Sequence, residues 1–246
     1  MAPVGAIIVA AGGSTRMGPS THSTGSGQAG SGQAVDKLFA LLGGQPLLLR
    51  ALQPFQESPL VDRIVLVLSA ANLERGRALA DACGIGKLTA ACEGGPRRQD
   101  SVRLGLEALG PCEWVLVHDG ARPLVSAALI ERGLAAARET GAAVPAIPLA
   151  DTLKLAAPDG TVERTLDRSR LWAAQTPQVF RYDLLLRAHR EVTAEVTDDA
   201  AMLEALGLPV RLYEGSPANI KVTTPDDLRL AEALLEAGAA SVRGNA

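Results

Sequence analysis

The sequence predicts an α/β fold built on a mostly parallel sheet with helices on both faces. Short, almost wholly apolar segments such as 4–9 and 114–117 alternate with longer segments of helical periodicity through the first 150 residues. Strands that are apolar on both sides are buried on both faces, and helix-length connections join parallel strands. Apolar residues make up 47% of the 246 residues and aromatic residues only 3%, so we expect a core of Ala, Leu and Val.

The first 150 residues divide into strands and helices in turn. Strands are expected at residues 4–9, 61–68, 87–92, 114–117 and 142–147, and helices at 46–56, 72–83, 98–109 and 126–140. Pro46 suits a first helical turn, where its missing N–H costs nothing. Ligands of such sheets bind at the carboxyl ends of strands, where the strand order reverses. We therefore expect residues 10–18 and 118–123 to lie at a ligand site.

The alternation stops between Asp151 and Trp172. Residues 151–155 and 161–165 are expected to form two short strands, joined by the turn sequence Pro158-Asp159-Gly160. A polar two-stranded hairpin is not stable alone, so it should lie against something else, with a partner subunit as one candidate. Helices at 182–192, 198–206 and 225–237 and a strand at 210–214 complete the expected elements.

Two segments have the composition of flexible chain. Residues 19–35 are rich in Gly, Ser, Thr and Gln, and the sequence of 25–29 is repeated at 30–34. They contain a G-x-G-x-x-G match, but no strand precedes it and no apolar helix follows, which argues against a dinucleotide site. We predict a flexible loop at 19–35 and a flexible Gly/Ala-rich tail at 238–246.

Charge and composition exclude several classes of function. A net charge of −3 provides no basic field for a nucleic-acid partner. The apolar runs are too short to span a bilayer, and no charged segment with a following apolar core occurs at the N-terminus, so we expect no membrane partner and a cytoplasmic location. Cys83, Cys92 and Cys112 lack C-x-x-C spacing, which predicts free thiols in a reducing compartment.

The loop after the first strand favours a phosphate site. In Ala10–Gly18, small residues let backbone N–H groups approach an anion, and Arg16 offers a planar set of donors. The loop lacks the Gly-Lys-Ser/Thr of a Walker A motif and the glycine spacing of a dinucleotide fingerprint. Lys37 follows the flexible loop, and two cations at one strand end repel each other unless a polyanion lies between them. A tight turn with a solvated Arg and Lys is the simpler alternative.

Two further segments point to anionic ligands. Gly94–Ser101 follows a strand and opens a helix, whose N-terminus favours an anion, although an ordinary glycine turn has the same sequence. Asp119 ends an apolar strand, where an unpaired charge is costly. Mg²⁺ carried by nucleotide phosphates would pair with it; an ion pair with Arg122 or a helix cap is the alternative. His118 is expected to be a packed strand residue rather than a base.

Taken in order, these motifs resemble the 2-C-methyl-D-erythritol 4-phosphate cytidylyltransferases of the non-mevalonate isoprenoid pathway. The resemblance spans nearly the whole chain, through Ala10–Gly12 with Arg16-Met17, Asp36-Lys37, Gly94–Val102, Val117–Pro123, Asp151–Lys154, Asp167-Arg168 with Leu171-Trp172, Gln175–Gln178, Thr197–Ala200 and Asn219–Val222. It implies a Rossmann-like, GT-A-like nucleotidyltransferase fold in one domain, residues 1–237, with a protruding hairpin arm at 150–172.

The resemblance implies CTP-dependent transfer of CMP to a polyol phosphate, with release of diphosphate. It implies that the nucleotide is held by Ala10, Ala11, Gly12, Gly13, Gly95, Ser101 and Asp119, and that Mg²⁺ or another divalent cation is held by Asp119. Catalytic roles fall to Arg16, Lys37, Arg168 and Lys221, and the acceptor is lined by Asp119, Arg122, Thr152, Arg168, Thr176, Thr197 and Lys221. In this family the arm is exchanged across a homodimer, which would bring Thr152 and Arg168 to the neighbouring subunit's site.

Three alternatives stay open. The same fold could serve another acceptor such as ribitol 5-phosphate, the chain could be a catalytically silent nucleotide-binding module, or it could be a Rossmann oxidoreductase. The implied chemistry needs no general base, because a phosphate monoester with a second pKa of about 6 is already largely dianionic near neutral pH. The segment between Arg16 and Lys37 is longer and richer in Gly and Ser than is usual in the family.

Overall fold

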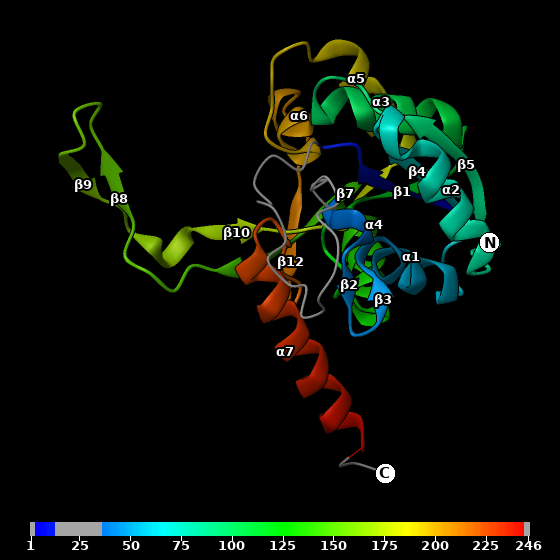
Figure 1. Cartoon of the computed structure of the whole chain (residues 1–246). Coiled ribbons are helices and arrows are strands. Elements are labelled where there is room, and N and C mark those ends of the chain that lie inside the picture. The colour runs from blue at the N-terminus through cyan, green and yellow to red at the C-terminus, as the bar shows by residue number, and fades with distance from the viewer. Residues whose placement is uncertain (1–2, 13–35, 244–246) are drawn as a thin grey trace.

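A central sheet, helices on both of its faces and a projecting hairpin make up the fold (Figure 1). The computed structural model describes residues 3–12 and 36–243. The sheet has eight strands in the order β10-β7-β11-β6-β1-β4-β5, with β12 paired to β7. Its strands are β1 (Val4–Ala10), β4 (Arg63–Leu68), β5 (Leu88–Glu93), β6 (Trp114–Asp119), β7 (Ala142–Pro148), β10 (Trp172–Ala174), β11 (Gln178–Arg181) and β12 (Arg211–Glu214).

Seven α-helices surround the sheet in the described part of the chain. They are α1 (Leu47–Glu57), α2 (Leu73–Ala82), α3 (Arg98–Leu109), α4 (Ala127–Thr140), α5 (Tyr182–Glu191), α6 (Asp199–Ala205) and α7 (Pro225–Arg243). Short 3₁₀ turns lie at Lys37–Phe39 (η1), Ala70–Asn72 (η2) and Arg168–Arg170 (η3), and a small hairpin, β2 (Leu41–Leu42) with β3 (Gln45–Pro46), contacts α7. None of the helices described is long and apolar enough to cross a bilayer.

Alternating side chains of the strands build two cores. Ala6 and Ile8 of β1 pack on one face with α1 and α4, whereas Ile7 faces α3, α5 and α6 on the other. The same alternation runs through β4 and β6, because successive strand side chains point to opposite faces. The core contains few aromatic residues and consists mainly of the Ala, Leu and Val that the sequence predicted, together with Ile.

The strand order reverses at β1, which lies between β4 and β6 and runs parallel to both. In the register of the sheet, Ala10 lies opposite Leu68, and Val9 lies opposite Asp119. The carboxyl ends of β1 and β6 therefore meet at the reversal point, as the sequence predicted. This edge of the sheet is where an α/β fold opens a ligand crevice.

The sheet is mostly parallel, as predicted, and the antiparallel pairs among the described residues include those of β11 with β6 and β7 and of β10 with β7. One expectation needs correction. The last helix does not end near Ala237 but continues to Arg243, so most of the expected flexible tail, 238–246, is helical. The predicted flexible loop at 19–35 lies outside the described residues.

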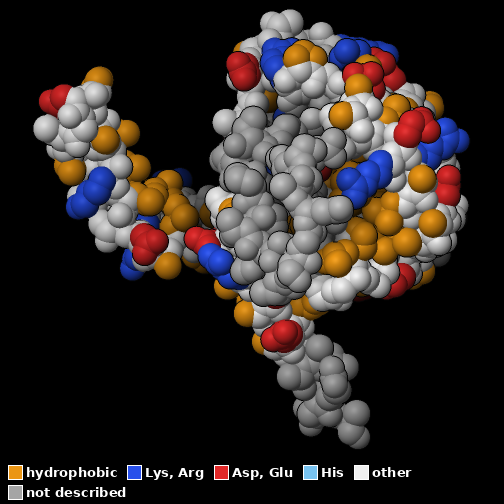
Figure 2. Space-filling view, viewed as in Figure 1, with side chains coloured by type: hydrophobic (Ala, Val, Ile, Leu, Met, Phe, Trp, Pro, Cys, Tyr) orange, Lys and Arg blue, Asp and Glu red, His pale blue; other side chains and the backbone are white. Residues whose placement is uncertain are grey.

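The predicted hairpin forms an arm that projects from the body of the protein, as Figures 1 and 2 show. Its strands, β8 (Lys154–Ala156) and β9 (Val162–Thr165), pair only with each other in the described structure. The arm carries exposed hydrophobic side chains: Val162 is 60% exposed and Trp172, at its base, is 43% exposed. The two short paired strands that the sequence predicted are therefore present, at slightly different bounds.

Candidate active site

A cavity of about 300 Å³ opens at the carboxyl edge of the sheet. It is bounded by the end of β1, the turn η1, the loop between β5 and α3, the end of β6 and the segment before α7. The residues that line it are Val9, Ala10, Ala11, Gly12, Lys37, Leu38, Gly95, Pro96, Arg97, Arg98, Ser101, Asp119, Ala121, Lys221 and Thr223. The cavity therefore combines small residues with four cationic side chains and one carboxylate.

Two glycines let the loops of this edge approach each other. A Cβ atom on Gly94 would lie 2.3 Å from the Cβ of Ala11, and one on Gly120 would lie 2.9 Å from the Cβ of Ala10. Real Cβ atoms do not approach that closely, so both positions need glycine for packing. The loops after β5 and β6 are thus packed directly against the end of β1.

The N-terminus of α3 forms one wall of the cavity. The first turn of this helix is held by Arg97, whose backbone N–H and Nε donate to Asp100 Oδ2 at 3.2 and 2.8 Å. The Ser101 hydroxyl lies within hydrogen-bond distance of the Arg97 and Gly95 carbonyls. A helix N-terminus with glycine before it presents backbone N–H groups to an anion. This wall therefore suits a phosphate or another polar edge of a nucleotide.

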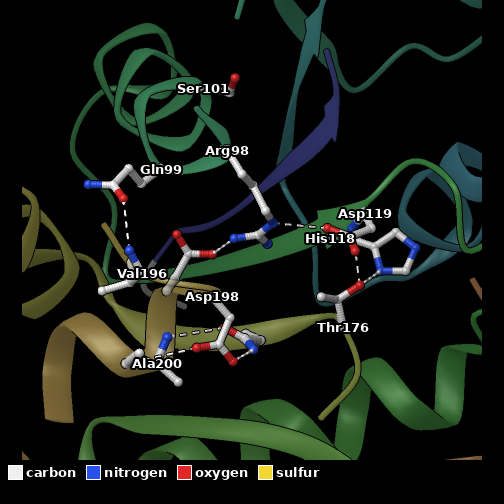
Figure 3. A network of polar contacts seen from close by, with 12 residues as sticks. Arg98, Gln99, Ser101, His118, Asp119, Thr176, Val196, Asp198 and Ala200 are labelled. Atoms are coloured by element: carbon white, nitrogen blue, oxygen red, sulfur yellow. Dashed lines mark hydrogen bonds and ion pairs between the residues drawn. The ribbon is translucent and has the colours of Figure 1, made fainter. Parts of the chain in front are cut away.

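Asp119 is contacted by three cationic side chains, and Figure 3 shows its contact with Arg98. Its Oδ2 lies 2.8 Å from Lys221 Nζ and 4.0 Å from Arg122 Nε, and its Oδ1 accepts from Arg98 Nε at 3.2 Å. Burial alone would raise the pKa of Asp119, but the three cations outweigh it and hold the pKa below its usual range. The carboxylate is therefore ionised at every pH near neutrality.

Behind Asp119, a hydrogen-bonded chain fixes its backbone. His118 Nε2 lies 3.0 Å from the Arg122 carbonyl, which can only accept, so Nε2 carries the proton and Nδ1 accepts from the Thr176 hydroxyl at 3.0 Å. Thr176 Oγ1 in turn accepts from the Asp119 N–H at 3.0 Å. Burial lowers the pKa of His118 to about 4, so it is neutral. His118 is the packed strand residue that the sequence predicted.

Lys221 is brought to the site by a segment that runs along the loop after β6. The Val222 N–H donates to the Ala121 carbonyl at 2.8 Å, and Arg122 Nη1 donates to the Asn219 carbonyl at 2.7 Å. Asn219, which is fully buried, donates from Nδ2 to the Thr176 carbonyl at 2.8 Å. These contacts hold the backbone at 219–222, while the Lys221 side chain itself is 43% exposed.

Most of the predicted site residues are brought together by this fold. Those in the cavity wall are Ala10, Ala11, Gly12, Lys37, Gly95, Ser101, Asp119 and Lys221. Arg122 lies against Asp119, and Thr176 lies behind it rather than in the wall. Gly13 and Arg16 lie outside the described residues.

Three predicted acceptor residues are not in this cavity. Thr152 and Arg168 are exposed on the arm, and Thr197 is exposed just before Asp198, which caps α6. No role was predicted for Arg98 or for Asp199, although Arg98 Nη1 lies 2.6 Å from Asp199 Oδ2. Arg98 is one of two adjacent arginines at a helix start and Asp199 is an ordinary first-turn acid, so only their long-range contact distinguishes them.

The side chains that line the cavity fit a metal ion that takes a single carboxylate ligand from the protein. Within the part of the chain that is described, no group of three or more His, Cys, Asp or Glu side chains could hold a metal. Mg²⁺ is commonly bound through one or two carboxylates, with substrate phosphates and water as its other ligands. Asp119, with Oδ2 held by a partly exposed lysine, fits that single-carboxylate arrangement.

Cationic side chains and a helix N-terminus at the reversal point of a mostly parallel sheet are typical of an α/β protein that acts on a phosphorylated ligand. The family model described as "2-C-methyl-D-erythritol 4-phosphate cytidylyltransferase" (IspD) matches residues 4–237. The chain belongs to this family.

Individual relatives agree over nearly the full length. A 2-C-methyl-D-erythritol 4-phosphate cytidylyltransferase of Dehalococcoides mccartyi (strain CBDB1) is 50% identical over 235 residues, which cover 96% of this chain and 97% of the relative. Among solved structures, 4-diphosphocytidyl-2C-methyl-D-erythritol synthase of Anaerococcus prevotii DSM 20548 has a TM-score of 0.79 at 28% identity, covering 95% of this chain and 96% of that one. The structure of the Thermus thermophilus cytidylyltransferase is 39% identical with a TM-score of 0.70, covering 81% of this chain and 94% of that one.

Proposed function

We propose that the chain transfers CMP from CTP to 2-C-methyl-D-erythritol 4-phosphate in the cavity around Asp119. Its family supplies the reaction, a CTP-dependent cytidylyl transfer. The observation that carries the assignment of the site is Asp119, ionised and flanked by Lys221, Arg98 and Arg122 at the carboxyl edge of the sheet. Such an arrangement suits two phosphorylated substrates that must be brought together.

The nucleotide half of the site consists of backbone and small side chains. The loop after β1, Gly95, Ser101 and the N-terminus of α3 line one side of the cavity and suit the cytidine and its phosphates. Lys37 lines the same cavity and is proposed to bind the phosphates together with Arg16. Cations fixed at the α-phosphate stabilise the charge that develops there as the new bond forms.

The acceptor half lies around Lys221 and Arg122. Both cations are held beside Asp119 and suit the phosphate of the polyol. An oxygen of that phosphate bonds to the α-phosphorus of CTP as the bond to the bridging oxygen breaks, and diphosphate leaves with the electron pair. The monoester is already largely dianionic, so no base is required, and neutral His118 is buried behind Asp119 and not used.

We also propose that Asp119 binds a divalent cation. The carboxylate would hold Mg²⁺ that is also bound by the nucleotide phosphates. Such an ion neutralises charge on the transferred phosphate and on the leaving diphosphate. The protein's own part is to present Asp119 in one orientation beside the phosphate-binding cations.

A homodimer would complete the site. Thr152 and Arg168 lie exposed on the arm, and the arm's exposed apolar side chains, with Val162 the most exposed, suit burial against a second copy. In the proposed dimer each arm reaches the partner's cavity, where Arg168 binds the acceptor phosphate. Thr152 lies near the base of the same arm and would accompany it.

We infer a cytoplasmic location. Cys83, Cys92 and Cys112 are free thiols, which agrees with a reducing compartment. The proposed nucleotide substrate is also a cytoplasmic metabolite class, so the site and the thiols favour the same compartment.

Diphosphate release measured with purified protein tests the proposed function. CTP with 2-C-methyl-D-erythritol 4-phosphate should release diphosphate, and UTP or ATP should be much slower, because the family that the chain belongs to transfers a cytidylyl group. Ribitol 5-phosphate is assayed separately. Faster turnover with ribitol 5-phosphate would assign the other acceptor, and no release with either would contradict the proposal.

A further inference from the structure

Buried charged side chains continue behind Asp119, from Arg98 in the cavity wall to residues outside the cavity. Arg98 of α3 donates from Nε to Asp119 Oδ1 at 3.2 Å and from Nη1 to Asp199 Oδ2 at 2.6 Å. Asp199 is the first residue of α6, with its side chain 1% exposed, and His189 Nε2 of α5 lies 3.7 Å from its other oxygen. This cluster therefore connects α3, α5 and α6 to the strand that carries Asp119.

Stability alone does not explain the cluster. Burying charges is costly, and replacing a buried ion pair by apolar residues of similar volume is often neutral or stabilising. Over the described residues, Arg98 Nη2, Asp199 Oδ1 and His189 Nε2 are buried without a hydrogen-bond partner, which adds to the cost. A costly charged cluster that touches the cavity residue Asp119 indicates a functional role.

The two oxygens of Asp119 are held in different ways. Oδ1 accepts from Arg98, whose side chain is 25% exposed and is also bound to buried Asp199. Oδ2 is paired with Lys221, which is 43% exposed and has a flexible four-carbon stem. When phosphates enter the cavity, Lys221 can turn toward them, whereas Arg98 is kept on Oδ1 by Asp199.

We propose that Arg98 is a positioning residue that fixes the side chain of Asp119 for cytidylyl transfer, and that Asp199 keeps Arg98 on Asp119 instead of on the substrate phosphates. This inference rests on the proposed function. Only a guanidinium can bind two carboxylates through Nε and Nη1 in one fixed geometry, because the ammonium of a lysine is a single point charge. Arginine, and not merely a positive charge, is therefore required at position 98.

The variant Arg98→Lys keeps the charge and removes this geometry. We expect kcat to fall by roughly 10- to 100-fold, the effect of misplacing a reacting group by about 1 Å. The Kd for CTP, measured without acceptor, should stay within about threefold of the unsubstituted protein's, since uniform substrate binding is not lost. Arg103→Lys is the matched control: Arg103 is on the same helix, is exposed and pairs with Glu107, so its kcat should be unchanged.

The variant Asp199→Asn keeps the shape and removes the anchoring charge. It should also lower kcat and leave the Kd for CTP unchanged. The kcat of the double variant, Arg98→Lys with Asp199→Asn, should lie within about twofold of the kcat of Arg98→Lys alone, because the effects of coupled residues are not additive. Asp183→Asn, an exposed acid at the start of α5, is the control. If Arg98→Lys does not fold, Asp199→Asn alone decides the question by the same two measurements.

Three results would overturn the inference: a kcat for Arg98→Lys equal to that of the unsubstituted protein, a loss of CTP affinity as large as the loss of kcat, or additive effects in the double variant. A loss of affinity would make Arg98 a nucleotide-binding residue instead. Turnover by the unsubstituted protein separately tests the proposed function. If that turnover is absent, a crystal structure of Arg98→Lys still decides the positioning role, by whether the Asp119 side chain has turned away from its present orientation.

Discussion

Lys221 Nζ lies 2.8 Å from Asp119 Oδ2, and this pair joins two segments that are far apart in the sequence. The contact depends on hydrogen bonds that the loop after β6 makes with the backbone of 219–222, one from the Val222 N–H to the Ala121 carbonyl and one from the Arg122 side chain to the Asn219 carbonyl. Of the three cations beside Asp119, Arg98 is held in place by Asp199, whereas Lys221 is partly exposed on a flexible stem and Arg122 lies at 4.0 Å.

Replacing Lys221 by alanine should mainly affect the acceptor. We expect kcat/KM for the polyol phosphate to fall by about 100-fold, the effect of losing ~3 kcal/mol of charge stabilisation. The Kd for CTP should change little. Arg229→Ala removes an exposed cation on α7 and is the control. A larger effect on CTP binding than on acceptor kinetics would assign Lys221 to the nucleotide.

Gly94→Ala should separate the loops that form the nucleotide side of the cavity. The added methyl group would lie 2.3 Å from the Ala11 Cβ and 2.7 Å from Ser101 Oγ, so the backbone has to move. We expect roughly tenfold weaker CTP binding and a destabilisation of about 1–3 kcal/mol, as overpacking in a tight site usually causes. Gly86→Ala, at an exposed position where the added Cβ meets no atom within 4 Å, is the control for calorimetric titration. Equal CTP affinity in both variants would show that the close packing is not needed.

His118 should make the folded protein less stable as the pH falls below neutrality. Burial lowers its pKa in the folded state to about 4, below the ordinary value near 6.5, so the unfolded state binds the proton first. The resulting stability is present above pH 6.5 and is lost progressively toward pH 4, by about 2 kcal/mol between pH 7 and pH 5. Urea unfolding, measured without nucleotide or divalent ion, should show this loss in the free energy of unfolding. The free energy of unfolding of His118→Gln should fall by about 2 kcal/mol less over the same pH range. Parallel pH dependence in both proteins would mean that folding does not shift the pKa of His118.

Subunit mixing tests the exchanged arm. Lys37→Ala damages the body of a subunit, and Arg168→Ala damages its arm. Each alone should be nearly inactive, but a mixed dimer would combine one intact body with one intact arm and recover one site. Each variant mixed with itself is the control. Absence of recovery after verified subunit exchange would mean that every chain builds its site from its own arm or without it.

The helices and the parallel strands were predictable because each has its own periodicity. Helix α3 begins and ends where the sequence predicted, at Arg98 and Leu109. Strands β10 and β11 were not predicted, because segments of three and four residues with polar Gln178 among them carry little periodic signal. Their antiparallel pairing depends on long-range contacts with β6 and β7.

The residues of the site also differ in whether a local sequence signal or a long-range contact places them. Asp119 and the glycine loops were predictable because an acid after an apolar strand and glycines at a strand end have local signals. Asp199, buried and bound to Arg98, was not, since its burial follows from the packing of α6 against the sheet. Thr176 was expected to line the acceptor region, yet its hydroxyl proton is donated to His118.

Asp119 is proposed to lie at the reacting centre of the cytidylyl transfer. The most direct measurement is the rate of diphosphate release from CTP and 2-C-methyl-D-erythritol 4-phosphate by Asp119→Asn, expressed per folded, CTP-binding site. Asparagine keeps the shape and removes the charge, so we predict a fall in kcat of about 100- to 1,000-fold, the range seen when one preorganised electrostatic group is lost. A kcat within about threefold of the unsubstituted protein would contradict the account.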